Sequence, residues 1–344
     1  MKILNAPLKT KARAWLELAR ISNLPTAWTN VLAGWLLVGG QVGDARLGWL
    51  LFGASLLYSG GMVLNDAADA AFDREHKRDR PIPSGRVKAR AAWLGGGGML
   101  LGGGFLCTLL GGANGGLTVL LILAILAYDL YHKPWAGAVL VMGLCRSLLY
   151  LVAASAVGVR SISMTGGIKS NLDIVSVSSS GPQSEWTWCL PSEGVSFPCS
   201  FPFLRLDVPV HGARWLGAVA IGAYIVGLTM VARLEGRRGV AGIGEVLLSR
   251  GLLYTPGFLA AWHLMRGGDL KMGVLIVAFA CLIGWTSRMM RRGGPEIGRA
   301  VGWLLAGIAL VDSLAVAPVN FPLACVFALS VPLLRLWQRK IAAT

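Results

Sequence analysis

The sequence predicts an all-α fold, a multi-span transmembrane helical bundle. Of the 344 residues, 55% are hydrophobic and only 14% are charged, and the mean hydropathy is +0.62. Soluble domains carry about 25% charged residues, so this balance argues against a soluble enzyme, a coiled coil and a disordered chain. The 46 glycines are scattered through the apolar stretches, as in membrane helices that pack closely.

Ten apolar stretches are candidates for spans, because crossing the hydrocarbon core takes about 20 residues. They are residues 24–41, 47–66, 91–112, 115–132, 136–158, 213–234, 247–265, 271–288, 298–317 and 320–337. The last two stretches meet at the short segment Ala-Pro-Val-Asn, residues 317–320. The sequence therefore predicts nine or ten spans.

The distribution of positive charge predicts the orientation in the bilayer. The chain has 32 Lys and Arg against 17 Asp and Glu, for a net charge of +15. Most of the Lys and Arg residues lie in alternate connections between apolar stretches. These short connections offer no soluble basic face, so we expect no nucleic-acid partner. The positive-inside rule places the N-terminus and the 66–90 loop in the cytoplasm. We expect an integral membrane protein of a bacterial inner membrane.

The connections divide the chain into four parts. Residues 1–23 are basic and amphipathic and lack the cleavage site of a signal peptide, so we expect a cytoplasmic arm. Residues 24–159 form the N-terminal half of the bundle and residues 213–344 the C-terminal half. Residues 160–212 between them are a long, serine-rich outside insertion that contains two cysteines. Those cysteines form a disulfide or stay free, and the insertion is a tolerated surface segment or a docking element.

Four polar residues continue the second span, namely Asn65, Asp66, Asp69 and Asp73. Their spacing of three and four residues places them along one face of a helix. Neighbouring carboxylates repel one another, and a divalent cation relieves that repulsion. Hard oxygen ligands suit Mg²⁺, which often binds carboxylates together with substrate phosphates. The alternative is a solvated helix end whose Asp and Arg residues pair locally.

A basic segment, which includes Arg74, Arg80 and Arg86, follows the acidic residues directly. Arginine binds phosphate oxygens with two parallel hydrogen bonds. Carboxylates for a metal ion beside arginines for phosphate, at the mouth of a membrane bundle, predict an amphiphilic diphosphate. Its charged head would lie at the interface and its tail among the helices.

These motifs resemble a known family. Residues 65–73 (Asn-Asp-x-x-Asp-x-x-x-Asp), followed by 80–86 (Arg-Pro-Ile-Pro-Ser-Gly-Arg), resemble the first aspartate-rich motif of the UbiA-type intramembrane prenyltransferases, and residues 20–26 resemble the start of that family's first span. The span pattern agrees everywhere except in 160–212. The resemblance implies a bundle whose central cavity opens near the cytoplasmic side and binds an isoprenoid diphosphate through Mg²⁺. Members transfer the prenyl group to an aromatic or other lipophilic acceptor and release pyrophosphate.

The resemblance extends to two later segments. The loop after the fourth span in this family carries Tyr and Lys, and here Lys133 is either a phosphate contact or an ordinary interface anchor. The second acidic motif is reduced to Glu235, so Arg233 and its neighbours could neutralise the diphosphate directly. This reduced motif is similar to that of the EboC-like branch.

Arg146 is a charged residue within the fifth predicted span. A lipid-facing arginine is costly, so we expect Arg146 to face the cavity. It either contacts a phosphate or the acceptor, or pairs internally with Asp129 or a backbone carbonyl. Asp312, near the opposite end of its span, is expected to make a structural hydrogen bond.

Together these features predict a Mg²⁺-dependent prenyltransferase. The expected metal ligands are Asp66, Asp69, Asp73 and Glu235. The expected catalytic residues are Asp69, Asp73 and Lys133, and the expected substrate-binding residues are Asn65, Arg74, Arg80, Arg86, Arg146 and Arg233. The expected partners are a prenyl diphosphate, a lipophilic acceptor and membrane lipid. An alternative of another class is a non-catalytic binder or carrier of an isoprenoid lipid, and the sequence leaves the acceptor, the prenyl chain length and the oligomeric state open.

Overall fold

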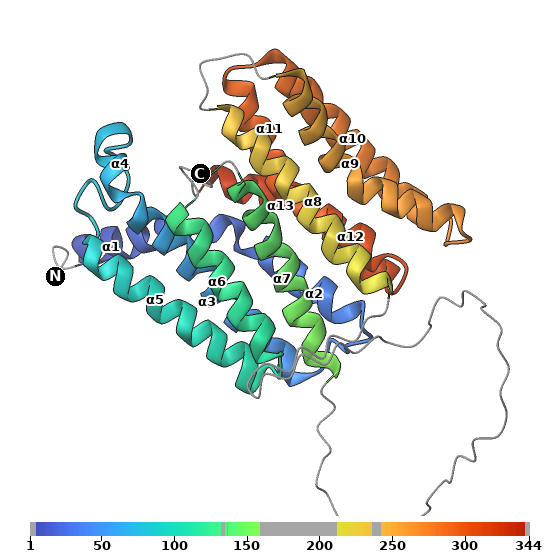
Figure 1. Cartoon of the computed structure of the whole chain (residues 1–344), viewed down its shortest axis with the longest axis horizontal. Coiled ribbons are helices and arrows are strands. Elements are labelled where there is room, and N and C mark those ends of the chain that lie inside the picture. The colour runs from blue at the N-terminus through green and yellow to red at the C-terminus, as the bar shows by residue number, and fades with distance from the viewer. Residues whose placement is uncertain (1–4, 132–134, 136, 159–211, 236–241, 341–344) are drawn as a thin grey trace, which may run out of the picture.

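The predicted all-α class is confirmed by a computed structural model (Figure 1). The structure describes residues 5–131, 135, 137–158, 212–235 and 242–340. The predicted outside insertion, 160–212, lies almost wholly outside these residues, and so do both of its cysteines. Within the described residues the regular structure is helical, without strands.

Each predicted apolar stretch corresponds to a helix or to a pair of consecutive helices. The first half contains α1 (Asn5–Leu18), η1 (Ile21–Asn23), α2 (Leu24–Leu36), α3 (Ala45–Ala68), α4 (Ala70–His76), α5 (Ala89–Phe105), η2 (Leu106–Leu110), α6 (Gly115–Tyr131) and α7 (Ala138–Gly158). The second half contains α8 (Gly212–Glu235), α9 (Ile243–Met265), α10 (Met272–Arg292), α11 (Pro295–Ala306), α12 (Ile308–Val316) and α13 (Phe321–Lys340).

Seven helical segments in the described part of the chain are long and apolar enough to cross a membrane. They are Ala45–Ala68, Ala89–Leu110, Ala138–Val157, Trp215–Arg233, Met272–Arg292, Pro295–Val316 and Phe321–Gln338. Helix α6 is apolar but shorter, and α2 has only 13 residues. The predicted positions of the helices are thus confirmed, whereas nine or ten full-length spans remain a prediction.

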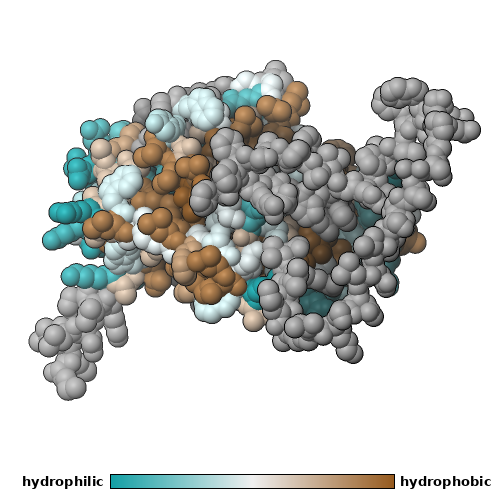
Figure 2. Space-filling model, turned by 60° about the horizontal axis from the view of Figure 1, so that its bottom comes forward, coloured by the Kyte–Doolittle hydropathy of each residue, from teal (hydrophilic) through white to brown (hydrophobic). Residues whose placement is uncertain are grey.

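The surface of the bundle is largely apolar. Large hydrophobic side chains are exposed along α5, α6, α9, α10 and α13, including Leu101, Leu123, Phe258, Val274 and Leu329. Figure 2 shows a brown apolar surface on the body of the molecule and hydrophilic residues gathered at the end that carries α1 and α4. This distribution is the one expected of helices that face lipid, with one polar end in water.

Glycines allow α3 and α5 to pack with their backbones in contact. A Cβ atom on Gly60 would lie 2.9 Å from the carbonyl oxygen of Gly96, and one on Gly103 would lie 2.7 Å from that of Gly53. Both distances are too short for real atoms, so the side chain must be absent. Small residues at such a contact are how membrane helices approach closely. The contact fixes the position of α3, whose last turn carries the acidic motif.

The helix geometry of the acidic motif is nearly that expected. Helix α3 ends at Ala68 and α4 begins at Ala70, so Asp69 lies at the junction. The backbone N–H of Asp69 still donates to Asn65 (3.0 Å), and that of Asp73 donates to Asp69 (2.9 Å). The spacing of four residues is therefore kept across the break.

The α3–α5 contact makes a stability prediction. Gly60→Ala should lower the free energy of unfolding by about 1–3 kcal/mol, because the added methyl group overpacks against the Gly96 backbone. Gly98→Ala is the matched control, since nothing lies within 4 Å of a Cβ at that position, and its stability should stay equal or rise slightly. Thermal unfolding in detergent micelles measures both variants. Equal midpoints for the two would contradict backbone contact between these helices.

Candidate functional site

Two buried carboxylates converge on one guanidinium at the end of α3. Arg80 Nη1 donates to Asp66 Oδ1 (3.2 Å) and to Asp73 Oδ2 (2.8 Å). The side chain of Asp73 is 2% exposed and that of Asp66 is 8% exposed. A buried charge is stable only when it is paired, and here both buried carboxylates share the Arg80 guanidinium as a partner.

The turn that carries Arg80 is anchored by its own hydrogen bonds and by burial. The backbone N–H and the hydroxyl of Ser84 both donate to the carbonyl of Arg80 (3.0 and 2.7 Å), and Val87 N–H donates to Pro81 (3.0 Å). Ile82 and Val87 are buried in a small hydrophobic cluster that includes residues of α1 and α3, among them Leu18 and Val63. The backbone of Arg80 is therefore held in place while its side chain reaches the acids.

Arg20 is a second cation on the acidic pair, and it was not among the predicted site residues. Its Nη2 donates to Asp66 Oδ1 (3.2 Å). Arg20 has φ 45°, and it is the only non-glycine residue with a positive φ in the described part of the chain. Such left-handed backbone is uncommon outside glycine and is found at functional sites. The sequence contained a signal for it, because Arg20 opens the segment that resembles the start of the family's first span.

Asn65, the first residue of the motif, connects α3 to α6. Its Nδ2 donates to Asp129 Oδ1 (3.3 Å), and Asp129 is 4% exposed. Asn65 thus directly precedes Asp66 in the chain, but its side chain bonds to a different carboxylate, that of Asp129.

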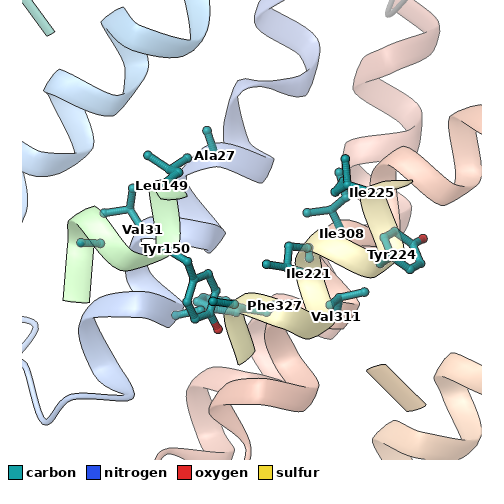
Figure 3. Packing of buried hydrophobic residues seen from close by; sticks show 14 of the residues in the cluster. Ala27, Val31, Leu149, Tyr150, Ile221, Tyr224, Ile225, Ile308, Val311 and Phe327 are labelled. Carbon is teal, nitrogen blue, oxygen red and sulfur yellow. The ribbon is translucent and has the colours of Figure 1, made fainter. Parts of the chain in front are cut away.

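A mainly apolar cavity of about 250 Å³ is lined by Arg20, which also bonds to Asp66 of this cluster. Arg20, Asn23, Tyr128 and Asp129 line its polar end. Its wall is apolar and comes from α3, α6, α7, α8, α11 and α12, with Leu57, Leu121, Leu149, Ile225 and Ile308 among the lining residues. Figure 3 shows Leu149 on one side and Ile225 and Ile308 on the other. A pocket with an apolar wall and a few polar groups is typical of a small-molecule site.

Arg146 lies on the wall of this cavity, as expected. Its Nη1 donates to Asn30 Oδ1 (2.7 Å) and its Nη2 to Thr26 Oγ1 (3.1 Å). The guanidinium also lies over the ring of Tyr58, 5.6 Å from the ring centre. Because Tyr58 precedes Asp66 by two turns of α3, Arg146 lies deeper in the bundle than the acidic pair by about 12 Å of helix rise.

A buried carboxylate supports Arg146 through an amide. Asn30 Nδ2 donates to both carboxylate oxygens of Asp312 (2.8 and 2.9 Å), and Asp312 is fully buried. The expected structural hydrogen bond of Asp312 is confirmed. The internal partner of Arg146 is thus Asn30 rather than Asp129, and the chain Arg146–Asn30–Asp312 ties α7 to α2 and α12.

The remaining predicted residues lie around the cluster or outside the described residues. Arg86 pairs with Glu17 of α1 (2.9 Å) instead of with the acids. Arg74 is exposed, and Arg233 is close enough to act electrostatically on Tyr128. Lys133 and the side chain of Glu235 lie outside the described residues.

The chemistry of the acidic pair fits the expected Mg²⁺. Oxygens of Asp66 and Asp73 come within 3.2 Å of one atom, Arg80 Nη1, so one cation at that position could contact both carboxylates. Carboxylate oxygens are the ligands that Mg²⁺ prefers. In the described part of the chain no three His, Cys, Asp or Glu side chains form a metal-ligating group, and the predicted set of metal ligands stays a prediction.

Comparison with known proteins gives one family. The UbiA prenyltransferase family matches residues 26–191. Digeranylgeranylglyceryl phosphate synthase of Methanopyrus kandleri is 33% identical over 149 residues, 41% of this chain and 53% of that protein. The 4-hydroxybenzoate octaprenyltransferase of Aeromonas salmonicida is 38% identical over 93 residues, 25% of this chain and 32% of that protein. The chain thus matches about half the length of the first of these relatives and a third of the other.

Solved structures share the whole fold. A UbiA homologue from Aeropyrum pernix K1 superimposes with a TM-score of 0.58 at 17% identity, covering 87% of this chain and 97% of that one. A structure from work on digeranylgeranylglyceryl phosphate synthase in membranes gives 0.57 at 16% identity, covering 90% and 98%. At these identities the likeness shows the fold alone. This chain is therefore similar to the UbiA prenyltransferase family over residues 26–191 and shares its fold with a solved UbiA homologue.

Proposed function

We propose that this protein transfers an isoprenoid group from a prenyl diphosphate to a lipophilic acceptor within the membrane and releases pyrophosphate. The observation that carries the proposal is a cavity with an apolar wall whose polar end is lined by Arg20, the residue that also bonds to Asp66 of the charged cluster. A prenyl diphosphate has the same two parts, an anionic head and an apolar tail. Relatives named for the synthesis of digeranylgeranylglyceryl phosphate and for octaprenyl transfer support this assignment.

The charged cluster is the proposed site for the diphosphate. Arg20 and Arg80 would bind phosphate oxygens, because both guanidinium groups already reach the acidic pair. Asp66, Asp73 and the neighbouring Asp69 would hold Mg²⁺, which when bound neutralises the diphosphate and favours its departure. Asn65 would orient the end of α3 through Asp129.

Five further residues complete the proposal. Glu235 stays a proposed metal ligand and Lys133 a proposed catalytic contact to the leaving pyrophosphate. Arg74, Arg86 and Arg233 would raise the positive potential that attracts the diphosphate. The reduced acidic motif around Glu235 supports placement in the EboC-like branch.

The apolar wall would protect the reaction. Departure of pyrophosphate leaves an allylic carbocation-like carbon, which water would quench. Leu57, Leu121 and Ile225 line the cavity and would exclude that water. Arg146 lies deeper, over Tyr58, and would contact the acceptor.

We place the protein in a bacterial inner membrane, with the charged end of the bundle in the cytoplasm.

Loss of one acid should abolish product formation. Asp73→Asn removes the carboxylate that lies closest to Arg80, so turnover should fall about 100-fold or more, as when a group that stabilises the transition state is lost. Asp79→Asn is the matched control, since Asp79 is exposed on the same segment. Membranes with each variant are incubated with radiolabelled prenyl diphosphate, Mg²⁺ and a lipid extract as the acceptor source, and lipid-soluble products are separated by chromatography.

The outcomes of this assay separate the two function classes. A Mg²⁺-dependent product made by the wild type and Asp79→Asn, and absent with Asp73→Asn, would support the transferase. Retention of label without any product, even by the wild type, would favour the isoprenoid carrier. A normal product from folded Asp73→Asn would contradict the metal site.

Arg146 should affect transfer more than diphosphate binding. Arg146→Gln keeps a donor for Asn30 but removes the charge from the cavity wall, so product formation should fall at least about tenfold, or 1.4 kcal/mol of transition-state binding. Retention of labelled prenyl diphosphate should stay near the wild-type value, because Arg146 lies about two turns from the acidic pair. Arg288→Gln, on the exposed surface of α10, is the control. Equal loss of binding and transfer would contradict an acceptor-side role.

A further inference from the structure

Arg80 occupies the space between the two buried carboxylates that a divalent cation would need. We propose that Arg80 is an internal counter-cation, which is exchanged for the divalent cation when a diphosphate draws its guanidinium away. Cation and diphosphate would then bind as a cooperative pair. This inference rests on the proposed function, because it concerns the same charged cluster.

The first step in the argument is the shared position. One nitrogen atom, Arg80 Nη1, contacts Asp66 Oδ1 at 3.2 Å and Asp73 Oδ2 at 2.8 Å. A cation bound to both oxygens would have to lie where this nitrogen lies. Two positive charges cannot share that space, since their repulsion is strong away from bulk water. The guanidinium and the cation therefore exclude each other.

The second step is the balance of charge. Asp66 and Asp73 are matched by the guanidinium groups of Arg20 and Arg80. A divalent cation added alone would displace Arg80 and leave that arginine without its anions. A diphosphate added alone would withdraw Arg80 and leave a buried carboxylate unpaired, which is strongly unfavourable. Binding of both ligands together restores the balance, so each should raise the affinity for the other by the same factor.

The third step is how the exchange can occur. The backbone of Arg80 is fixed by the bonds from Ser84, whereas its side chain is 20% exposed and reaches solvent. Rotation of this long side chain toward the rim is enough to vacate the acidic pair. Arg20 keeps its contact with Asp66 from the other side. The exchange thus needs no movement of the turn or of α3.

Direct binding of Mn²⁺ to the purified full chain tests the exchange without a turnover assay. The free Mn²⁺ signal in electron paramagnetic resonance gives the affinity in the absence of any phosphate. Arg80→Gln removes the competing charge and should bind Mn²⁺ at least tenfold more tightly than the wild type. Arg78→Gln is the control, because Arg78 is exposed and its Nε donates to the Arg74 carbonyl rather than to the acidic pair. The double variant Arg80→Gln with Asp73→Asn should lose this gain in Mn²⁺ affinity.

Inorganic pyrophosphate supplies the second arm. Pyrophosphate should raise the Mn²⁺ affinity of the wild type at least tenfold and that of Arg80→Gln by clearly less. Asp73→Asn is the control, because it shows how much Mn²⁺ pyrophosphate binds in solution without the acidic pair. Arg80→Lys keeps the charge without the planar fork, so its Mn²⁺ affinity should lie between that of the wild type and that of Arg80→Gln. This variant provides a test if Arg80→Gln does not fold.

The two possible failures are distinguishable. Equal Mn²⁺ affinity of Arg80→Gln and the wild type, with or without pyrophosphate, would overturn the exchange and leave the proposed function intact. Absence of any binding of Mn²⁺ with pyrophosphate to the wild type would overturn both.

Discussion

The pairing of two buried carboxylates with arginine is the interaction on which the site depends. Asp66 lies near the end of α3 and Asp73 lies in α4, and the two buried carboxylates are paired with Arg80 and Arg20. A buried charge without a partner is strongly unfavourable. With these partners, two carboxylates and two guanidinium groups lie together beside an apolar cavity that Arg20 lines.

Several distant parts of the structure serve this pairing. The glycine contact between α3 and α5 sets where the last turn of α3 lies. The left-handed backbone at Arg20 aims its side chain at Asp66. The ion pair between Arg86 and Glu17 ties the turn that bears Arg80 to α1. Deeper in the bundle, the chain from Arg146 to Asp312 holds a second cation on the cavity wall.

The sequence predicted the class of fold correctly, because the fold class follows from local patterns, whereas the roles of the site residues stay predictions. Apolar stretches mark helices, and the spacing of Asn65, Asp66, Asp69 and Asp73 survives even the helix break. The number of full spans was harder, since a helix such as α2 covers only part of its apolar stretch.

Side-chain partners were the part that spacing could not supply. Arg80 and Arg86 are equivalent as basic residues in a loop, yet one binds the acidic pair and the other binds Glu17. That difference comes from the fold of the turn, which depends on the buried Ile82 and Val87. Likewise, the sequence around Asn30 and Tyr58 gives no sign that these residues contact Arg146. The contacts form because the fold brings α2, α3 and α7 together.

Photo-crosslinking tests most directly whether the apolar cavity that Arg20 lines holds a prenyl diphosphate. A radiolabelled farnesyl diphosphate with a photoreactive group at its tail is irradiated with the protein and Mg²⁺, and labelled peptides are mapped by mass spectrometry. We expect label on cavity residues of α3, α6 and α8, such as Leu57, Leu121 and Ile225, and its loss with excess unlabelled prenyl diphosphate. Label confined to the outer apolar pocket around His263 and Met272, or to the lipid-facing surface, would contradict the account.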